Sequence, residues 1–159
     1  MKILIVSDTH GRQENLRQVL LNVSPVDLLI HCGDTEGAEN EIIHMAGCPC
    51  EIVRGNNDFF SNLPSEREFN IGKYRVWLLH GHNFYVSMGP EHLLDEAKAK
   101  NIDIVMYGHT HRPVIEREGN ITLINPGSIS YPRQDGREPT YIIMELDNEG
   151  MAHFTINKM

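Results

Sequence analysis

The sequence predicts an α/β fold in which two packed β-sheets form a β-sandwich flanked by helices. Short apolar runs alternate with helical patterns in the first third of the chain, and hairpin patterns fill the last third. A further hairpin, helix and apolar run lie between them. Alternating strands and helices imply a parallel sheet with right-handed crossovers, whereas hairpins imply antiparallel strands. The chain of 159 residues is expected to form one domain, residues 1–159, because that length can bury a core.

The first third is expected to contain three strands and two helices. The strands are the apolar runs at residues 2–6, 28–30 and 52–53. Such uninterrupted runs are typical of parallel strands that are buried on both faces. The helices are predicted from apolar residues at i, i+3 and i+4 spacing. They occur in two groups: Leu16, Val19, Leu20 and Val23, and Ala38, Ile42, Met45 and Ala46.

The middle of the chain combines a hairpin, a helix and one more buried strand. Residues 66–71 and 73–79 are expected to pair around Gly72, because glycine suits the backbone of a tight turn. A helix opens near Pro90, since proline is tolerated in a first helical turn. Its apolar face carries Leu93, Leu94 and Ala97. Residues 104–106 form the strand that follows.

The last third is expected to consist of two hairpins. Residues 114–117 and 121–124 flank a Gly-Asn pair, and residues 141–146 and 152–156 flank an Asn-Glu-Gly turn. Apolar and polar residues alternate in the final strand, which predicts that one of its faces meets solvent.

The composition excludes several classes of protein. The formal net charge of −8 disfavours general nucleic-acid binding, because polyanions need basic patches. The apolar run near the start is too short for a signal peptide or a membrane span, so no membrane association and a cytoplasmic location are expected. Three cysteines do not predict a disulfide framework. Cys48 and Cys50 are interpreted as structural rather than as a metal pair, and Cys32 as a small buried residue.

Residues that bind metal ions follow five of the predicted strands. Carboxyl ends of strands in α/β sheets meet at one edge, where sites form. Carboxylate, imidazole and amide groups suit Mn²⁺, Fe or Zn²⁺. Seven candidate ligands exceed the need of one tetrahedral ion, and two ions sharing a bridging carboxylate fit that number better. The candidates are Asp8, His10, Asp34, Asn56, His80, His109 and His111.

Each candidate ligand also has a purely structural interpretation. A lone histidine is more often a core residue that is hydrogen-bonded to the backbone. Asp8 or Asp34 alone would suit a helix cap, and Asn56 alone would suit a turn. Structural roles explain the whole set badly, because all seven follow strand ends. The remaining histidines are interpreted as structural or surface residues: His31, His44, His92 and His153.

The five motifs, taken in order, resemble those of the calcineurin-like metallophosphoesterase superfamily. They read D-x-H from Asp8, G-D ending at Asp34, G-N-x-D ending at Asp58, H-G-H from His80 and G-H-x-H ending at His111. The short chain and the Asn-Pro-Gly-Ser segment at residues 125–128 resemble the small bacterial and archaeal YfcE-like phosphodiesterase branch. The resemblance implies a four-layer fold and a metal-dependent phosphoric ester hydrolase.

The resemblance also implies a ligand set for two divalent ions per chain. Mn²⁺ is the expected metal, with Fe, Zn²⁺ and Ni²⁺ as alternatives. The expected reaction is hydrolysis of small phosphate diesters by a hydroxide that bridges the ions. Asp34 would be shared by both ions. The first ion would be held by Asp8, His10, Asp34 and His111, and the second by Asp34, Asn56, His80 and His109.

Asn57, Asp58 and His82 are expected to be catalytic. His82 is a candidate acid or phosphate contact, although a structural role is the slightly favoured interpretation of this histidine taken alone. Asn57 stands where many superfamily members carry a histidine. Asparagine donates a hydrogen bond but supplies no proton at neutral pH, which favours diesters over monoesters with poor leaving groups. Arg12 and Arg133 are candidate phosphate contacts, because planar guanidinium groups suit paired oxygens. A solvated surface charge is an equally weighted interpretation of both arginines.

Two other functions compete with a small-molecule phosphodiesterase. One is a non-catalytic, Vps29-like protein-interaction module of the same fold, but such scaffolds tend to lose ligands and this chain keeps all seven. The other is a nuclease of the recombination-repair type, which the acidic charge and the short chain disfavour. A small phosphate ester is therefore the expected partner, nucleic acid is not expected, and a homo-oligomer is left open.

Overall fold

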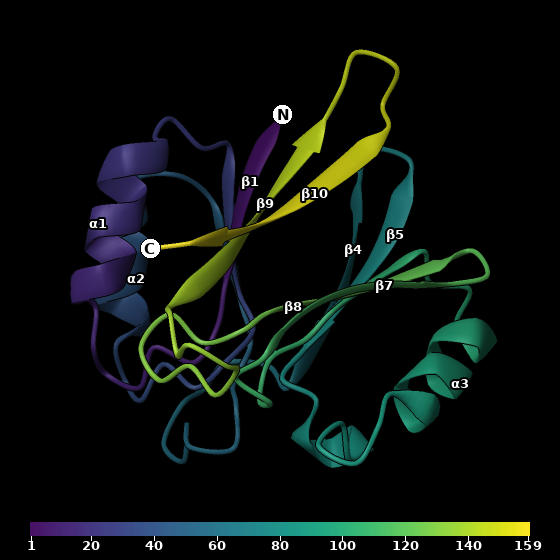
Figure 1. Ribbon diagram of the computed structural model, residues 1–159, viewed down its shortest axis with the longest axis horizontal. Helices are drawn as coiled ribbons and strands as arrows, with labels where there is room; N and C mark the ends of the chain where they lie inside the picture. Colours follow the sequence, from purple (N-terminus) through teal and green to yellow (C-terminus); the bar gives the residue numbers. More distant parts are fainter.

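The computed structural model describes residues 1–159 as two five-stranded sheets that pack face to face (Figure 1). The first sheet has the strand order β10-β9-β1-β2-β3 and the second has the order β4-β5-β6-β8-β7. The first sheet consists of β1 (Lys2–Val6), β2 (Leu28–His31), β3 (Cys50–Ile52), β9 (Thr140–Leu146) and β10 (Ala152–Lys158). The second consists of β4 (Glu66–Ile71), β5 (Tyr74–Leu79), β6 (Ile104–Met106), β7 (Pro113–Glu118) and β8 (Ile121–Pro126).

Both sheets are mixed, with parallel strands on one side or at the centre. In the first sheet β1, β2 and β3 are parallel, β9 is antiparallel to β1, and β10 is antiparallel to β9. In the second sheet β5, β6 and β8 are parallel, and β4 and β7 form antiparallel edges. The carboxyl ends of the parallel strands within each sheet therefore point the same way.

Helices cover the two outer faces and complete four layers (Figure 1). Helices α1 (Glu14–Val23) and α2 (Glu39–Ala46) pack on the first sheet, and α3 (Glu91–Ala99) packs on the second. A short 3₁₀ turn, η1 (His82–Phe84), follows β5. This architecture confirms the predicted helix-flanked β-sandwich. None of the helices combines the length and the apolar character needed to cross a membrane.

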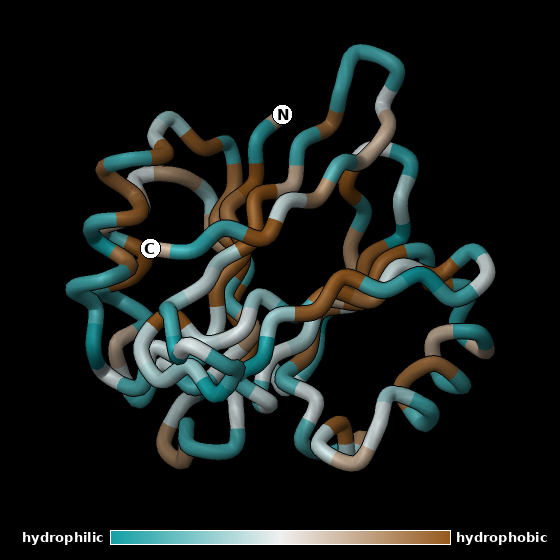
Figure 2. Tube along the Cα trace, in the orientation of Figure 1, coloured by the Kyte–Doolittle hydropathy of each residue, from teal (hydrophilic) through white to brown (hydrophobic).

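The apolar run of β1 is continuous because both of its faces are buried. Ile3 and Ile5 point between the sheets, whereas Leu4 and Val6 pack beneath α1 and α2. All four side chains are fully shielded from solvent. Figure 2 shows the same pattern along the chain, with hydrophobic segments on the strands and hydrophilic ones at the turns.

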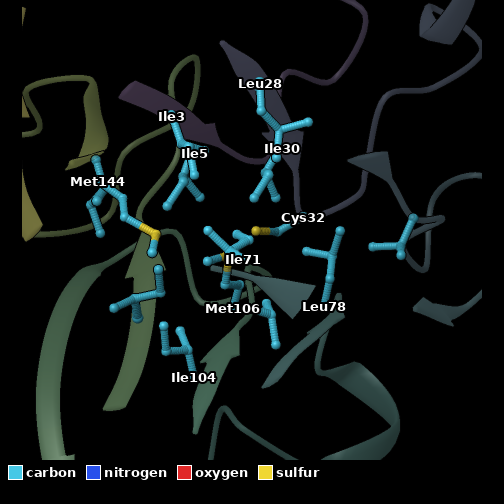
Figure 3. Packing of buried hydrophobic residues seen from close by; sticks show 14 residues of the cluster. Ile3, Ile5, Leu28, Ile30, Cys32, Ile71, Leu78, Ile104, Met106 and Met144 are labelled. Atoms are coloured by element: carbon cyan, nitrogen blue, oxygen red, sulfur yellow. The ribbon is translucent and has the colours of Figure 1, made fainter. Parts of the chain in front are cut away.

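The core between the sheets joins the two halves of the fold. Figure 3 shows side chains of β1 and β2, with Cys32 just beyond β2, facing those of β5 and β6, and the set includes Ile30, Cys32, Leu78 and Met106. Cys32 is fully buried, as the sequence predicts. Fixing the two sheets against each other fixes the relative positions of the loops that leave them.

Differences between the structure and the sequence prediction at β3, α3 and β10 have a physical explanation. The third strand is β3, which ends at Ile52, so the predicted residue Val53 lies outside it although it is fully buried. Helix α3 begins at Glu91, and Pro90 occupies the N-cap position rather than the first turn. Ile156 of β10 is 37% exposed, so the apolar face of this strand is only partly covered near the end of the chain.

Candidate metal centre

The seven predicted ligands lie together at one end of the sandwich. They belong to the loops that follow β1, β2, β3, β5 and β6, at the lower centre of Figure 1. Nε2 of His111 is 3.1 Å from Oδ1 of Asp8, across about a hundred residues of sequence. Nε2 of His80 is 3.4 Å from Oδ2 of Asp34. Side chains distant in sequence thus converge because the parallel strands end at this edge.

The ligand atoms form two overlapping groups. Asp8, His10 and His111 form one group, and Asp8, Asp34 and His80 form the other, with all ligand atoms of a group within 4.8 Å of one another. Oδ2 of Asp34 lies 3.4 Å from Nε2 of His80 and 3.8 Å from Nε2 of His10. The Asp34 carboxylate therefore lies between the two groups.

Asn56 and His109 extend the second group. Oδ1 of Asn56 is 3.1 Å from Nε2 of His80 and 2.9 Å from Nδ1 of His109. The His80 and His109 rings meet edge to face at 5.2 Å between centroids. The second group therefore presents a carboxylate, an amide oxygen and two imidazoles to one small volume.

Hydrogen bonds to carbonyl oxygens set the tautomers of two histidines. Nδ1 of His80 donates to the backbone oxygen of Cys32 at 2.7 Å, and Nδ1 of His111 donates to that of Tyr131 at 2.6 Å. A carbonyl oxygen only accepts, so each Nδ1 carries the proton and each neutral ring has its lone pair at Nε2. Both Nε2 atoms point into the ligand groups, which is the usual arrangement of metal-binding histidines.

The surroundings of His10 require a positive charge between its Nε2 and Nε2 of His111. Nδ1 of His10 lies 2.7 Å from Oε1 of Glu36, and its Nε2 lies 3.2 Å from Nε2 of His111. Two nitrogen lone pairs at this distance repel unless a cation lies between them. In addition, Oδ1 of Asp8 is buried without any hydrogen-bond partner. A divalent cation would satisfy all of these atoms at once, so the residues fit a metal site.

The two central carboxylates are ionised. Burial raises the pKa of Asp34, but the hydrogen bond and charge of His80 and hydrogen bonds from Asn57 outweigh it and hold that pKa well below its ordinary value. Burial likewise raises the pKa of Asp8, and His111 and His80 bring the net value below the ordinary one. Two negative charges thus meet in a mostly buried place, which favours a bound cation.

The pKa values of the two histidines in the second group, His80 and His109, are shifted in opposite directions. Burial lowers the pKa of His80, but the Asp34 and Asp8 carboxylates outweigh it and raise the net value. The pKa of His109 is lowered, by burial first and by the charge of His80 second. The pKa of His82 is lowered by the same two effects.

The backbone is strained where it presents the ligands. Nine non-glycine residues have positive φ, and five of them are candidate ligands. Such conformations cost about 1–3 kcal/mol each and collect at functional sites. The five ligands are Asp8, His10, Asp34, His109 and His111, with φ between 48° and 69°.

His31 supports the ligand loops from behind. It is fully buried, and its Nδ1 accepts from the backbone N–H of Gly33 at 3.1 Å. Its Nε2–H therefore donates to Oγ1 of Thr9, 3.2 Å away. Burial lowers the pKa of His31 to about 4, although the Asp8 and Asp58 carboxylates raise it. His31 is thus the structural residue that the sequence predicts.

Replacing His31 with asparagine is expected to flatten the pH dependence of stability. Between pH 4 and 6.5 the unfolded chain binds the His31 proton and the folded chain does not, so the free energy of unfolding rises with pH over this window. The contribution is about 3 kcal/mol. Urea unfolding of chelator-treated protein at several pH values measures it. Identical slopes for wild type and His31→Asn would contradict the assignment of a neutral histidine.

Asn57 holds the Asp34 carboxylate from two sides. The backbone N–H of Asn57 donates to Oδ1 of Asp34 at 2.8 Å, and its side-chain Nδ2 donates to Oδ2 at 2.8 Å. The predicted catalytic residue therefore contacts the carboxylate that lies between the two ligand groups. Its direct structural role is to orient that carboxylate.

Asp58 ties two ligand loops together. It is buried, and its Oδ2 accepts from the backbone N–H groups of Asp34 at 2.9 Å and Gly55 at 2.7 Å. Its Oδ1 accepts from the N–H of Glu36 at 2.6 Å and from Oγ1 of Thr35 at 3.1 Å. Both oxygens are occupied, so the geometry favours a positioning role for Asp58 over contact with a substrate.

His82 lies at the rim of the second group. Its ring centroid is 5.4 Å from that of His80 and 6.1 Å from that of His109. Its Nδ1 is buried and has no hydrogen-bond partner. His82 therefore keeps an unused polar atom beside the candidate ligands.

The two predicted phosphate-binding arginines lie in different surroundings. The Arg12 guanidinium stacks 4.7 Å from the centroid of the Tyr131 ring. Arg133 lines a cleft of about 490 Å³ that opens beside the first ligand group. The cleft is also lined by His10, His111, Glu36, Tyr131 and Arg137.

Sequence reasoning missed three residues of this cleft: Glu36, Tyr131 and Arg137. Glu36 lies two residues after Asp34 and resembles an ordinary surface acid in the sequence. Tyr131 and Arg137 lie in the loop after β8. β8 is parallel to β6, so its carboxyl end lies at the same edge of the sheet as the ligand loop after β6. The position of this loop after β8 was the one sequence signal that could have identified Tyr131 and Arg137.

Comparison with known proteins identifies the family. The domain described as the calcineurin-like phosphoesterase superfamily domain matches residues 1–149. The chain belongs to the calcineurin-like phosphoesterase superfamily. This membership confirms the resemblance carried by the five sequence motifs. It places the chain in a family of metal-dependent phosphoesterases.

Individual relatives agree with this membership. The chain is 34% identical to the probable metallophosphoesterase YsnB of Bacillus subtilis, over 94% of this chain and 86% of the relative. It is 34% identical to the phosphodiesterase YfcE of Escherichia coli, over 99% and 93%. A predicted phosphoesterase from Streptococcus pneumoniae has the same fold, with a TM-score of 0.81 and 28% identity over 98% of this chain and 97% of that chain.

The fold is also shared with Vps29, which the solved structure from Cryptosporidium parvum names Vacuolar Protein Sorting 29. Wild-type Vps29 from Entamoeba histolytica, solved as a complex with Zn²⁺, superposes with a TM-score of 0.78 over 99% of both chains. The identity is 21%, so this likeness concerns the fold alone.

Proposed function

We propose that this superfamily member is a dinuclear metal-dependent phosphodiesterase that hydrolyses small phosphate diesters. The observation that carries the proposal is the pair of overlapping ligand groups, in which histidine Nε2 atoms face buried carboxylates, and the pKa of the Asp34 carboxylate is lowered. The family membership and the relatives named as phosphodiesterases support the same reaction class.

The proposed ligand assignment follows the two groups. Asp34 is shared, because its Oδ2 lies between Nε2 of His80 and Nε2 of His10. When bound, two divalent ions would supply charge stabilisation for the phosphate and a water that ionises near neutral pH. The first ion is assigned to Asp8, His10, Asp34 and His111, and the second to Asp34, Asn56, His80 and His109.

The other residues prepare the site and orient the ligands. Asn57 holds both oxygens of Asp34, and Glu36 turns His10 so that its Nε2 faces the ligand group. Such partners of metal ligands change metal affinity or activity by about 10–100-fold when removed. His82 lies at the rim beside His80 and His109, and we assign the contact with the leaving oxygen of a diester to its Nε2, because its Nδ1 is buried.

Metal removal and restoration test the proposal. Protein stripped by a chelator is expected to lose hydrolysis of bis(4-nitrophenyl) phosphate and to regain it with Mn²⁺. His109→Ala should lower the restored rate, whereas His44→Ala, at an exposed position of α2, should not. Elemental analysis should find two ions per loaded chain. An absence of hydrolysis with Mn²⁺, Fe²⁺, Zn²⁺ and Ni²⁺ would contradict the proposal.

Replacing Asn57 with histidine is expected to shift activity toward monoesters. A histidine supplies a proton to a poor leaving group, and such general acid catalysis contributes 10²–10⁴-fold. The ratio of kcat/KM for 4-nitrophenyl phosphate to that for bis(4-nitrophenyl) phosphate should therefore rise by about tenfold or more. The control is Asn57→Ala, which removes the hydrogen bond to Asp34 without offering a proton. An unchanged ratio in Asn57→His would show that position 57 does not set the preference.

A protein-interaction module of the Vps29 kind is the second candidate. The observation that favours it is a pair of exposed aromatic side chains, Phe59 and Phe60, with exposed fractions of 79% and 101%. They directly follow the Asn57–Asp58 segment, and exposed apolar patches mark interaction surfaces. A stoichiometric complex with one partner, formed by metal-free protein and lost in Phe60→Ser, would favour this function. A cytoplasmic location stays a prediction, and a homo-oligomer stays open.

A further inference from the structure

We propose that the cleft lined by Tyr131, Arg133 and Arg137 binds a second anionic group of the substrate. This inference rests on the proposed function and names its substrate class. The preferred substrates are phosphate diesters in which one of the two alcohols carries a further phosphate or carboxylate. The metal centre would hold the diester group, and the cleft would hold the other charge.

The cleft and the metal centre share a wall. His10 and His111 line the cleft and also belong to the first ligand group. Its volume of about 490 Å³ falls within the range of small-molecule sites, about 300–1,000 Å³. A diester bound at the ligand groups would therefore extend one of its alcohols into this space.

Two hydrogen bonds fix the position of the cleft relative to His111, a candidate ligand. Nδ1 of His111 donates to the backbone oxygen of Tyr131 at 2.6 Å. The backbone N–H of Arg133 donates to the backbone oxygen of His111 at 3.0 Å. The segment that carries Tyr131 and Arg133 is thus bonded on both sides to a residue of the first ligand group. Such preorganisation lowers the entropy cost of binding a substrate that spans both places.

A serine anchors the same segment to the first ligand loop. Oγ of Ser128 donates to the backbone oxygen of Asp8 at 2.8 Å and accepts from the N–H of Tyr131 at 2.7 Å. The Tyr131 ring meets the His10 ring edge to face at 5.3 Å. The aromatic side chain therefore offers a fixed surface for the alcohol half of a diester.

The charge of the cleft is unusual for this acidic chain. Arg133 and Arg137 form no ion pair, and the neighbouring Glu138 pairs instead with Lys158. Glu36 is the one acid in the lining, and its Oε1 is engaged by Nδ1 of His10. Several arginines elsewhere are neutralised by glutamates: Arg17, Arg67 and Arg75.

Two unpaired guanidinium groups on one cleft indicate a site for an anion. Planar guanidinium groups bind phosphate and carboxylate through paired hydrogen bonds. Arg137 also has a φ of 46°, a conformation that L residues adopt at a cost. A turn closed by the N–H of Arg137 and the backbone oxygen of Gln134, at 3.0 Å, holds it there.

A matched pair of substrates tests the inference. Thymidine 5′-(4-nitrophenyl phosphate) and its 3′-phosphorylated analogue differ only in the extra phosphate. In both, water adds to phosphorus, the P–O bond to the nitrophenyl group breaks, and 4-nitrophenolate is released and measured by absorbance. The 3′-phosphorylated substrate is expected to have a kcat/KM at least about tenfold higher, because the extra phosphate would accept charge-assisted hydrogen bonds from the two guanidinium groups.

Arginine variants locate the effect. Arg133→Ala and Arg137→Ala should each reduce the advantage of the phosphorylated substrate to about twofold or less. Arg117→Ala is the matched control, because Arg117 is an exposed arginine of β7 outside this cleft, and it should keep the full advantage. Raising the salt concentration should also shrink the advantage in the wild type, because exposed charges are screened.

A binding measurement makes the test independent of turnover. Isothermal titration calorimetry of Mn²⁺-loaded protein should give a lower Kd for thymidine 3′,5′-bisphosphate than for thymidine 5′-monophosphate, and Arg137→Ala should remove the difference. Equal kcat/KM for the two substrates together with equal Kd values would overturn the inference and leave the proposed function standing. Hydrolysis of neither substrate under any metal loading would overturn both.

Discussion

The Asp34→Ala variant is expected to lose phosphodiester hydrolysis by about a thousandfold or more. Metal ions contribute several kcal/mol of charge stabilisation to such reactions, and about 4 kcal/mol corresponds to that factor. Asp34 is the carboxylate that lies between Nε2 of His80 and Nε2 of His10. Its loss should therefore weaken both ligand groups. The measurements are kcat/KM with bis(4-nitrophenyl) phosphate and the number of Mn²⁺ ions retained per chain.

Two further variants separate metal binding from folding. Asp34→Asn keeps the size of the side chain and removes its charge, so it should also lose most of the activity. Asp95→Ala removes an exposed carboxylate of α3 that makes no ion pair, so it should leave activity and metal content unchanged. Thermal unfolding with a chelator present reports whether each variant is folded. A folded Asp34→Ala that retains two ions and its activity would refute the shared-ligand assignment.

The fold could be predicted because strands that are buried on both faces need uninterrupted apolar runs, which are visible in the sequence. Ile3 and Ile5 face one core while Leu4 and Val6 face another, and only a continuous apolar run satisfies both. Val53 shows the limit of this reasoning. It is as buried as a strand residue but lies beyond the end of β3, and apolar character alone does not distinguish strand pairing from packing.

The ligands could be predicted because they follow strand ends, whereas their supporting residues depend on contacts across the chain. Tyr131 acts through its backbone oxygen, which any residue type offers to His111. Glu36 contacts His10 because its backbone has a φ of 53°, and no pattern in the sequence predicts this conformation. For Asp58, the sequence does not distinguish a carboxylate that contacts substrate from one that accepts backbone N–H groups.

The Gly55→Ala variant is expected to lose about a hundredfold in kcat/KM although it removes no ligand. A Cβ at position 55 would lie 2.0 Å from Oδ1 of Asp34 and 2.6 Å from its backbone nitrogen. Contacts this short force Asp34 to move, and a misplacement of about 1 Å in an active site costs about that factor. The backbone of Gly55 does not have positive φ, so alanine itself is not strained there.

The control and the readouts isolate the steric effect on Asp34. Gly119→Ala, in the turn between β7 and β8, meets nothing within 4 Å and carries only the strain of its φ of 60°, about 1–2 kcal/mol. It should therefore lose some stability and keep its activity, whereas Gly55→Ala should lose both activity and bound Mn²⁺. Crowding at position 55 should also cost about 1–3 kcal/mol in the free energy of unfolding. Full activity of Gly55→Ala would mean that the position of the Asp34 carboxylate does not limit catalysis, and that the reaction does not depend on a carboxylate shared by two ions.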